Sequence, residues 1–179
     1  MYLRKPLLAI AGAASLSILP ATASAHGSTH AESGGRRKNK ATAVYEDKAF
    51  GRPGERARVT RTVRIAGTDD MRYTPARIRV KQGETVRFVV RNGGKILHET
   101  VLGTKPELQE HYALMKKFPD MEHDEPYMVH LKPGETGEMV WQFTRVGEFY
   151  FACLMPGHYE RGMFGRITVT PSAKKGNVS

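Results

Sequence analysis

The chain has 179 residues and a formal net charge of +10, with 28 Lys and Arg, 18 Asp and Glu, and a single cysteine. One cysteine excludes an internal disulfide, so the fold must depend on its core. The charge would suit a nucleic-acid-binding protein, but the basic residues are scattered and do not group with stacking aromatic side chains. We therefore predict no nucleic-acid partner, while an acidic protein or an anionic membrane surface stays compatible with this charge.

The N-terminus has the form of a secretory signal. The basic pair Arg4-Lys5 precedes an apolar stretch from Leu7 to Leu19, and Ala23-Ser24-Ala25 is the small-x-small pattern that a signal peptidase cuts. The apolar stretch is too short to span a bilayer, and no later segment is long enough. We predict that residues 1–25 are removed and that a soluble periplasmic protein of charge +8 begins at His26, since Arg4-Lys5 leave with the signal.

The next stretch is predicted to be a flexible basic tail over residues 26–57. It is polar, and its run from Gly34 to Lys40 offers nothing to bury. A few apolar residues such as Phe50 could dock on the folded domain, but the turn-forming pair Pro53-Gly54 ends the segment. A second tail is predicted at residues 172–179.

Residues 58–171 show the alternation of apolar and polar residues that is typical of strands with one buried face. The runs are short and are separated by turns that contain Gly or Pro, which favours an all-β sandwich or barrel. In Lys81-Gln-Gly-Glu84 and Lys132-Pro-Gly-Glu135 the glycine suits the positive φ of a type II turn. The clearest runs are Val86, Phe88, Val90; Met139, Trp141, Phe143; Phe149, Phe151, Cys153; and Ile167, Val169.

One helical insertion, over about residues 104–127, interrupts these strands. Thr104-Lys-Pro-Glu107 has the form of a capping box, in which the threonine and glutamate side chains each bond the other's backbone. Leu108, Tyr112 and Met115 then follow at helical spacing.

The most informative stretch is Cys153-Leu-Met-Pro-Gly-His158-Tyr-Glu-Arg-Gly-Met163, which holds a thiol, an imidazole and a thioether. Five residues of extended chain span about 17 Å, so the chain must fold back if Cys153 and His158 share an ion. Pro156-Gly157 supplies that reversal. Two histidines, one cysteine and a weak axial methionine form the ligand set of an electron-transfer copper site.

The second histidine of such a site must come from elsewhere in the chain. Chemistry alone does not choose among the four in its central part, which are His98, His111, His123 and His130. We favour His98 because it enters an apolar strand, whose start a sandwich can bring beside the end of the cysteine strand.

Several stretches together resemble the cupredoxin (type 1, or blue, copper) family, and in particular plastocyanin, azurin and the periplasmic copper-tolerance members. The similarity covers about residues 58–171, and it is carried by Met71–Pro75, Ile78–Phe88, Asn92 to His98, and Phe149–Met163. This resemblance implies a Greek-key β-sandwich with one copper ion at one pole. It also implies that His98, Cys153 and His158 are the equatorial ligands and that Met163 is the axial ligand.

One position departs from the family pattern. Many members have asparagine directly after the first histidine, where its side chain ties the ligand loops together, but this chain has Glu99. Such neighbouring hydrogen bonds tune a copper site, so the resemblance does not predict the reduction potential or whether the site is blue or green.

Other interpretations of these residues are weaker. Cys153 and Met163 could be ordinary core residues. A structural zinc site would need four nitrogen or thiolate ligands, and methionine is a poor substitute. A Cys–His hydrolase would need a third, orienting group that is not evident in the sequence.

Further residues could bind additional copper at a second, weaker site. His111 and Met115 are spaced i,i+4 on one helix face, Met121 and His123 follow, and thioethers with imidazoles suit Cu(I). His26, as the mature N-terminus, would offer an amine and an imidazole to Cu(II).

We predict a non-enzymatic protein, because the chain lacks the paired histidine motifs of catalytic copper centres. The predicted activity is one-electron transfer that serves copper tolerance, with a c-type cytochrome or an oxidase as redox partner. Apolar residues around His158 would form the docking patch; these are Met155, Pro156, Tyr159 and Phe164. The alternative is a copper-sequestering protein or chaperone in which electron transfer is not the physiological role.

Overall fold

The computed structural model describes residues 46–118 and 123–172. The predicted signal peptide, most of the predicted N-terminal tail and residues 173–179 lie outside this part. The elements are β1 (Arg52–Pro53), a 3-10 turn (Arg56–Arg58), β2 (Arg61–Thr68), β3 (Arg72–Thr74), β4 (Arg77–Lys81), β5 (Thr85–Asn92), β6 (His98–Gly103), α1 (Lys105–Lys117), β7 (Met128–Leu131), β8 (Thr136–Gln142), β9 (Gly147–Ala152) and β10 (Phe164–Thr170).

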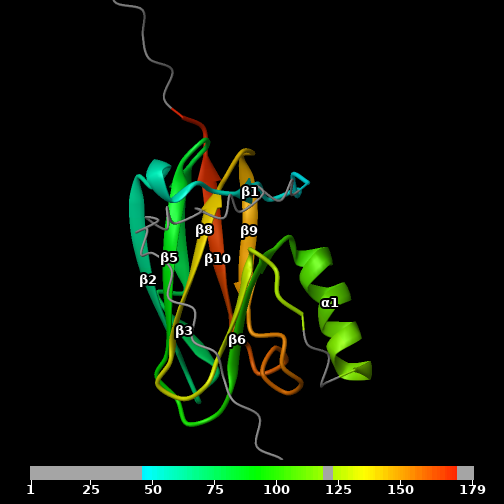
Figure 1. Ribbon diagram of the computed structural model, residues 1–179. Coiled ribbons are helices and arrows are strands. Elements are labelled where there is room, and N and C mark those ends of the chain that lie inside the picture. Colours follow the sequence, from blue (N-terminus) through cyan, green and yellow to red (C-terminus); the bar gives the residue numbers. More distant parts are fainter. Residues whose placement is uncertain (1–45, 119–122, 173–179) are drawn as a thin grey trace, which may run out of the picture. The chain divides into compact units, whose positions relative to one another are not determined.

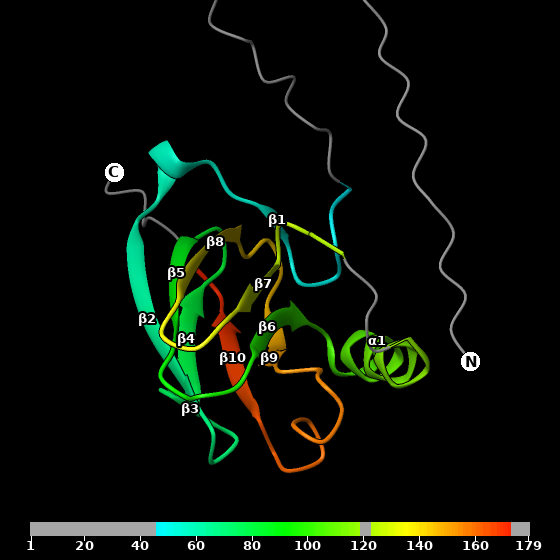
Figure 2. The ribbon, with the colours of Figure 1, turned by 60° about the horizontal axis from the view of Figure 1, so that its bottom comes forward.

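The strands form two five-stranded sheets, with the orders β1-β8-β5-β2-β3 and β4-β10-β9-β6-β7. The pairs β2/β5 and β4/β10 are parallel, and the other pairs are antiparallel. The two sheets face each other as the layers of a sandwich, with α1 at one side (Figures 1 and 2). The predicted all-β sandwich with one helical insertion is confirmed.

The core lies between the sheets, where the alternating residues meet. The predicted inward-facing residues of β5, β8, β9 and β10 are all at most 6% exposed, whereas their neighbours are more exposed at most positions. This is the arrangement expected when each strand has one buried face. The glycines of the two predicted turns, Gly83 and Gly134, have φ of 85° and 79°, in agreement with the sequence.

Residues 46–57, within the predicted tail, cover one edge of the sandwich. β1 pairs with β8, and Phe50 is only 2% exposed. The Phe50 ring stacks on Trp141 with 5.0 Å between ring centroids, and Nε1 of Trp141 donates a hydrogen bond to the backbone oxygen of Phe50. The folded part of the chain therefore includes residues N-terminal to position 58.

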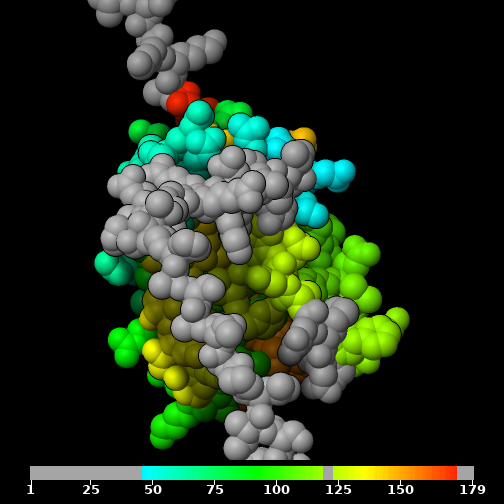
Figure 3. Space-filling model, in the orientation of Figure 1, coloured from blue at the N-terminus to red at the C-terminus, as the bar shows by residue number. Residues whose placement is uncertain are grey.

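Helix α1 packs on the outer face of the sheet that contains β6. Its capping box forms as predicted: the Thr104 side chain accepts from the Glu107 backbone, and the Glu107 carboxylate accepts from the Thr104 backbone. Leu108, Tyr112 and Met115 are buried against Val101 and neighbouring residues in a second, smaller core. All six residues of β6 are consequently buried, on both faces of the strand. The helix projects at the side of the sandwich (Figure 3).

No helix in residues 46–118 or 123–172 is long and apolar enough to cross a membrane.

Candidate metal centre

The loop between β9 and β10 folds back on itself, as the sequence requires. Cys153 follows β9 directly, and its backbone N–H donates to the backbone oxygen of Met163 at 3.0 Å. The N–H of Met163 in turn donates to the oxygen of His158 at 3.1 Å. Gly157 and Gly162 take φ of 85° and 91°, values that favour glycine. These bonds hold the backbones of the three predicted loop ligands together.

Three of the four predicted ligands converge at one end of the sandwich. The ligand atoms of His98, Cys153 and His158 all lie within 4.8 Å of one another. Sγ of Cys153 is 3.2 Å from Nδ1 of His158, and the centroids of the two imidazole rings are 5.1 Å apart. The loop that carries Cys153 and His158 and the connection from β5 to His98 lie at the same end of the sheets (Figure 1).

The orientation of His98 is fixed by an aspartate that sequence reasoning missed. Nε2 of His98 lies 3.0 Å from Oδ1 of Asp69, and the other carboxylate oxygen accepts from the backbone of Lys95. The hydrogen bond from Lys95 is the main cause of a lowered Asp69 pKa, and His98 contributes to it. A carboxylate behind a ligating imidazole is a common arrangement at metal sites, but no motif marks Asp69 in the sequence.

The remaining ring nitrogen of His98 is available for a metal. Nδ1 of His98 is buried and makes no hydrogen bond within the described part of the chain, although buried ring nitrogens normally have a partner. Cys153 is completely buried, and this burial raises the pKa of its thiol to about 11. Burial lowers the pKa of His158, with the neighbouring His98 and Arg161 adding to the effect. Two imidazoles and a thiol, which would lose its proton to a metal, fit copper well.

Met163 lies beside this cluster and is fully buried. Its terminal methyl group packs against Gly67 of β2, where an added Cβ would come within 3.0 Å of it. Glycine at position 67 thus leaves space for the methionine side chain. Together the four predicted residues, His98, Cys153, His158 and Met163, resemble a type 1 copper site.

Glu99 links the strand of His98 to the cysteine loop by hydrogen bonds, a role that asparagine has at this position in many members of the family. Its backbone N–H donates to Sγ of Cys153 at 3.3 Å, and its Oε2 accepts from the backbone N–H of Leu154 at 3.3 Å. The strand of the first histidine is thereby connected to the cysteine loop.

A second cluster lies nearby, and its membership differs from the sequence expectation. His111 and His123 come together, with 2.8 Å between their Nε2 atoms, but Met115 is buried in the small core. Glu99, which had not been predicted to bind copper, and His130, which lies among the further metal-capable residues near the insertion, join His123 in a group whose ligand atoms lie within 4.8 Å of one another. Met121 and His26 lie outside the described residues.

Comparison with known proteins gives consistent matches. A family model described as copper binding proteins, plastocyanin/azurin family, matches residues 59–170. "Copper-resistant cuproprotein CopI" of Rubrivivax gelatinosus is 50% identical over 144 residues, which cover 80% of this chain and 82% of that protein. The protein of the same name in Pseudomonas aeruginosa is 36% identical over 152 residues, which cover 69% of this chain and 83% of that protein.

Solved structures support the fold. Reduced auracyanin from Roseiflexus castenholzii aligns with a TM-score of 0.55 and 21% identity, over 63% of this chain and 99% of that one. Auracyanin B aligns with a TM-score of 0.56 and 20% identity, over 70% of this chain and 97% of that one.

The family consists of copper-binding proteins that are not enzymes, as the sequence had led us to expect. From the matched residues and the shared fold, the chain belongs to the plastocyanin/azurin family of copper-binding proteins.

Proposed function

We propose that the chain binds one type 1 copper ion and transfers single electrons through it. Nδ1 of His98, Sγ of Cys153 and Nδ1 of His158 would hold the ion, with Met163 as a fourth, weaker ligand. The observation that carries this proposal is the convergence of one ligand atom each from His98, Cys153 and His158 within 4.8 Å of one another, in a chain of a copper-binding family. Copper bound there supplies a Cu(II)/Cu(I) couple.

The surrounding chain favours electron transfer because it restricts movement of the ligands. Backbone hydrogen bonds join Cys153 to Met163 and Met163 to His158, and Asp69 holds the His98 ring. A site built on such a frame changes little between the two oxidation states, so little reorganisation is needed for each electron.

The surface around His158 fits a protein partner. Phe164 is 49% exposed, and Tyr159 packs between Phe164 and Tyr112. Ile96 and Leu97, just before His98, are 42% and 37% exposed. Exposed apolar side chains around a ligand edge form a docking surface. A c-type cytochrome or an oxidase in the periplasm is the proposed redox partner.

Copper tolerance is the proposed physiological role. The relatives that are 50% and 36% identical to this chain over the matched residues carry the name copper-resistant cuproprotein. We propose that this chain, exported after removal of residues 1–25, serves the same role in the periplasm.

The visible spectrum of the purified protein with Cu(II) tests the site. Thiolate-to-copper charge transfer should give an intense band at one copper per chain. A colourless copper-loaded protein would rule out the thiolate ligand and with it the proposed site.

Copper sequestration without physiological electron transfer is the second candidate function, favoured by the additional histidine cluster. Deletion of the gene separates a role in copper tolerance or sequestration from a role as an electron shuttle at ordinary copper. Growth loss only in excess copper favours sequestration or tolerance, whereas an electron-flow defect at ordinary copper favours the shuttle.

A further inference from the structure

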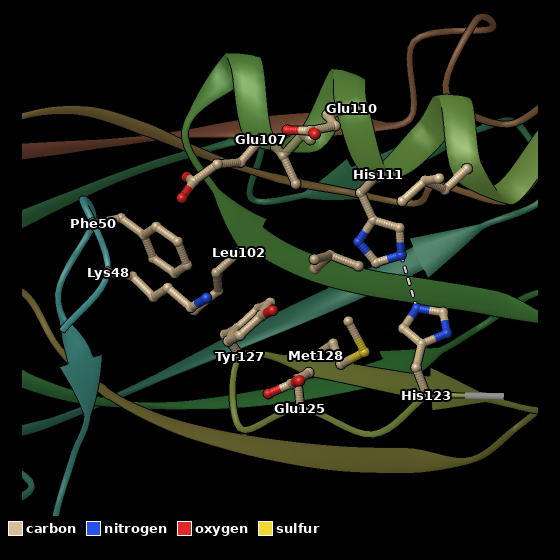
Figure 4. A pocket seen from close by; sticks show the side chains of 13 residues that line it. Lys48, Phe50, Leu102, Glu107, Glu110, His111, His123, Glu125, Tyr127 and Met128 are labelled. Carbon is tan, nitrogen blue, oxygen red and sulfur yellow. Dashed lines mark hydrogen bonds between the residues drawn. The ribbon is translucent and has the colours of Figure 1, made fainter. Parts of the chain in front are cut away.

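Four side chains outside the proposed type 1 site converge on the outer face of β6. Each comes from a different segment: Glu99 from β6, His111 from α1, His123 from the loop before β7, and His130 from β7. His111 points down from the helix and His123 points up from the loop, and the two rings face each other in the cavity (Figure 4).

The spacing of the polar atoms of Glu99, His123 and His130 suits ligands of one ion, since these atoms all lie within 4.8 Å of one another; His111 adjoins this group through His123. Oε1 of Glu99 is 3.0 Å from Nε2 of His130 and 3.6 Å from Nε2 of His123. Nε2 of His111 is 2.8 Å from Nε2 of His123. Two ligand atoms bound at about 2.0–2.1 Å to one ion are about 2.9 Å apart as neighbours in a square plane and about 3.4 Å apart in a tetrahedron. The observed distances lie close to this range.

The Glu99 carboxylate gives an independent reason to expect a cation. Its side chain is completely buried. Oε2 accepts one backbone hydrogen bond, from Leu154, but within residues 46–118 and 123–172 no group makes a hydrogen bond of good geometry to Oε1. A buried carboxylate is strongly unfavourable unless a positive charge compensates it.

We propose that Glu99, His123 and His130, with His111 as a fourth ligand, bind a second metal ion, and that this ion is Cu(II). Three imidazoles and a carboxylate offer nitrogen and oxygen without sulfur, which suits Cu(II) better than Cu(I). Among divalent first-row metals, copper binds such ligands most tightly. The inference does not rest on the electron-transfer function, because none of the four residues is a proposed type 1 ligand.

The second site is open to exchange with solvent. His111 and His123 line a cavity of about 290 Å³ that also contains Lys48 and Tyr127, and the His130 side chain is 34% exposed. By contrast, Cys153 is fully buried. The second ion should therefore be taken up and released faster than the type 1 copper.

The test counts Cu(II) ions in the full mature chain with His26→Ala and His30→Ala, which remove the N-terminal histidines as competing ligands. This parent should bind two Cu(II) ions: one with the intense charge-transfer band, and one whose electron paramagnetic resonance spectrum has the wider hyperfine splitting of nitrogen and oxygen ligands. Adding His123→Ala and His130→Ala should remove the second ion, with at least a 100-fold loss of affinity, and should keep the band. The retained band also shows that this variant is folded.

A matched control replaces the exposed acids of the same loop, Asp124→Ala and Glu125→Ala, and should still bind two ions. The proposal is overturned if the parent binds one ion, or if the histidine variant still binds two. If the histidine variant also loses the charge-transfer band, a second measurement tests the site directly. Crystals of the parent are grown with two equivalents of copper, and anomalous scattering locates the bound ions. A copper peak between Glu99 and His130 supports the site, and its absence beside a fully occupied type 1 site refutes it.

Discussion

The two histidine clusters of this protein lie on opposite faces of one strand and are held in different ways. His98 and Glu99 are neighbours in β6, and successive residues of a strand point to opposite faces. His98 faces a loop that backbone hydrogen bonds close on both sides. Glu99 faces side chains from α1, β7 and the loop before β7. The first cluster has a fixed frame, whereas the second depends on the docking of a helical insertion.

Because the two clusters are held differently, they suit two kinds of metal binding within one small domain. The buried thiol and its imidazoles suit a permanently bound redox ion, and the partly exposed imidazoles with a carboxylate suit an exchangeable one. The backbone of Glu99 donates to Sγ of Cys153 while its carboxylate belongs to the second cluster. Glutamate at this position therefore connects the two clusters.

Replacing Cys153 by serine should have the largest effect on copper binding. It should abolish the type 1 site and leave copper binding at the second cluster unchanged. The variant loses the only thiolate, so the intense charge-transfer band should disappear, while the cluster around Glu99 keeps its copper. Visible absorption and the copper-to-protein ratio, measured with His26→Ala and His30→Ala, check this. Loss of both ions would show that the two sites do not bind independently.

Replacing Asp69 by asparagine should weaken copper only at the first cluster. The substitution removes the charge behind the His98 ring, and loss of such a partner typically lowers metal affinity about 10- to 100-fold. Competition with a chelator measures the affinity.

Asp70→Asn is the control for this substitution, because Asp70 is exposed and its carboxylate accepts a hydrogen bond from Thr68, whereas Asp69 is the carboxylate beside His98. Equal losses in both variants would mean that the Asp69 carboxylate has no special role in positioning the histidine.

The pH dependence of copper binding should also distinguish the clusters. Burial raises the pKa of Cys153 to about 11 and lowers that of His158, so at neutral pH the thiol is protonated and the imidazole is neutral. Copper must displace one proton, and its affinity at the first cluster should rise about tenfold per pH unit from pH 7 to 9. Because the second cluster has no thiol, its copper affinity in Cys153→Ser should rise less steeply with pH over the same range. Equal slopes at the two sites would contradict this assignment.

The sandwich and the first cluster could be predicted from the sequence because their signals are local. Alternation marks the strands that bury Val86 and Phe88, and the run from Cys153 to Met163 contains three of the four proposed ligands within one loop. His98 was chosen by its position at the start of a strand and by resemblance to a family, and in the structure a ring nitrogen of His98 lies within 4.8 Å of the ligand atoms of Cys153 and His158.

The second cluster could not be predicted in full because it depends on tertiary packing. Glu99, His123 and His130 share no short motif, and they meet only when β6 pairs with β7. The helical spacing of His111 and Met115 predicted that both would bind the second copper ion, but the Met115 side chain is buried in the small core. No sequence motif marks Asp69 either, because only the folded chain brings its carboxylate close to His98.

The smallest predicted effect concerns the helix that carries His111. Thr104→Ala removes one half of the capping box of α1 and should lower the free energy of unfolding by about 1 kcal/mol. Because α1 presents His111 to the second cluster, copper affinity there should fall by a factor of up to about 5 if the full loss is felt locally. The first cluster should be unaffected. Urea unfolding of the copper-free protein and chelator competition measure the two quantities.

Lys105→Ala serves as the control, since Lys105 is exposed in the first turn of α1 and takes no part in the cap. If Thr104→Ala destabilises the protein but leaves second-site affinity unchanged, the cap does not control the position of His111 and the expected coupling between α1 and the second cluster is absent. If it weakens both clusters equally, α1 supports the whole end of the sandwich, and the two regions are a single unit.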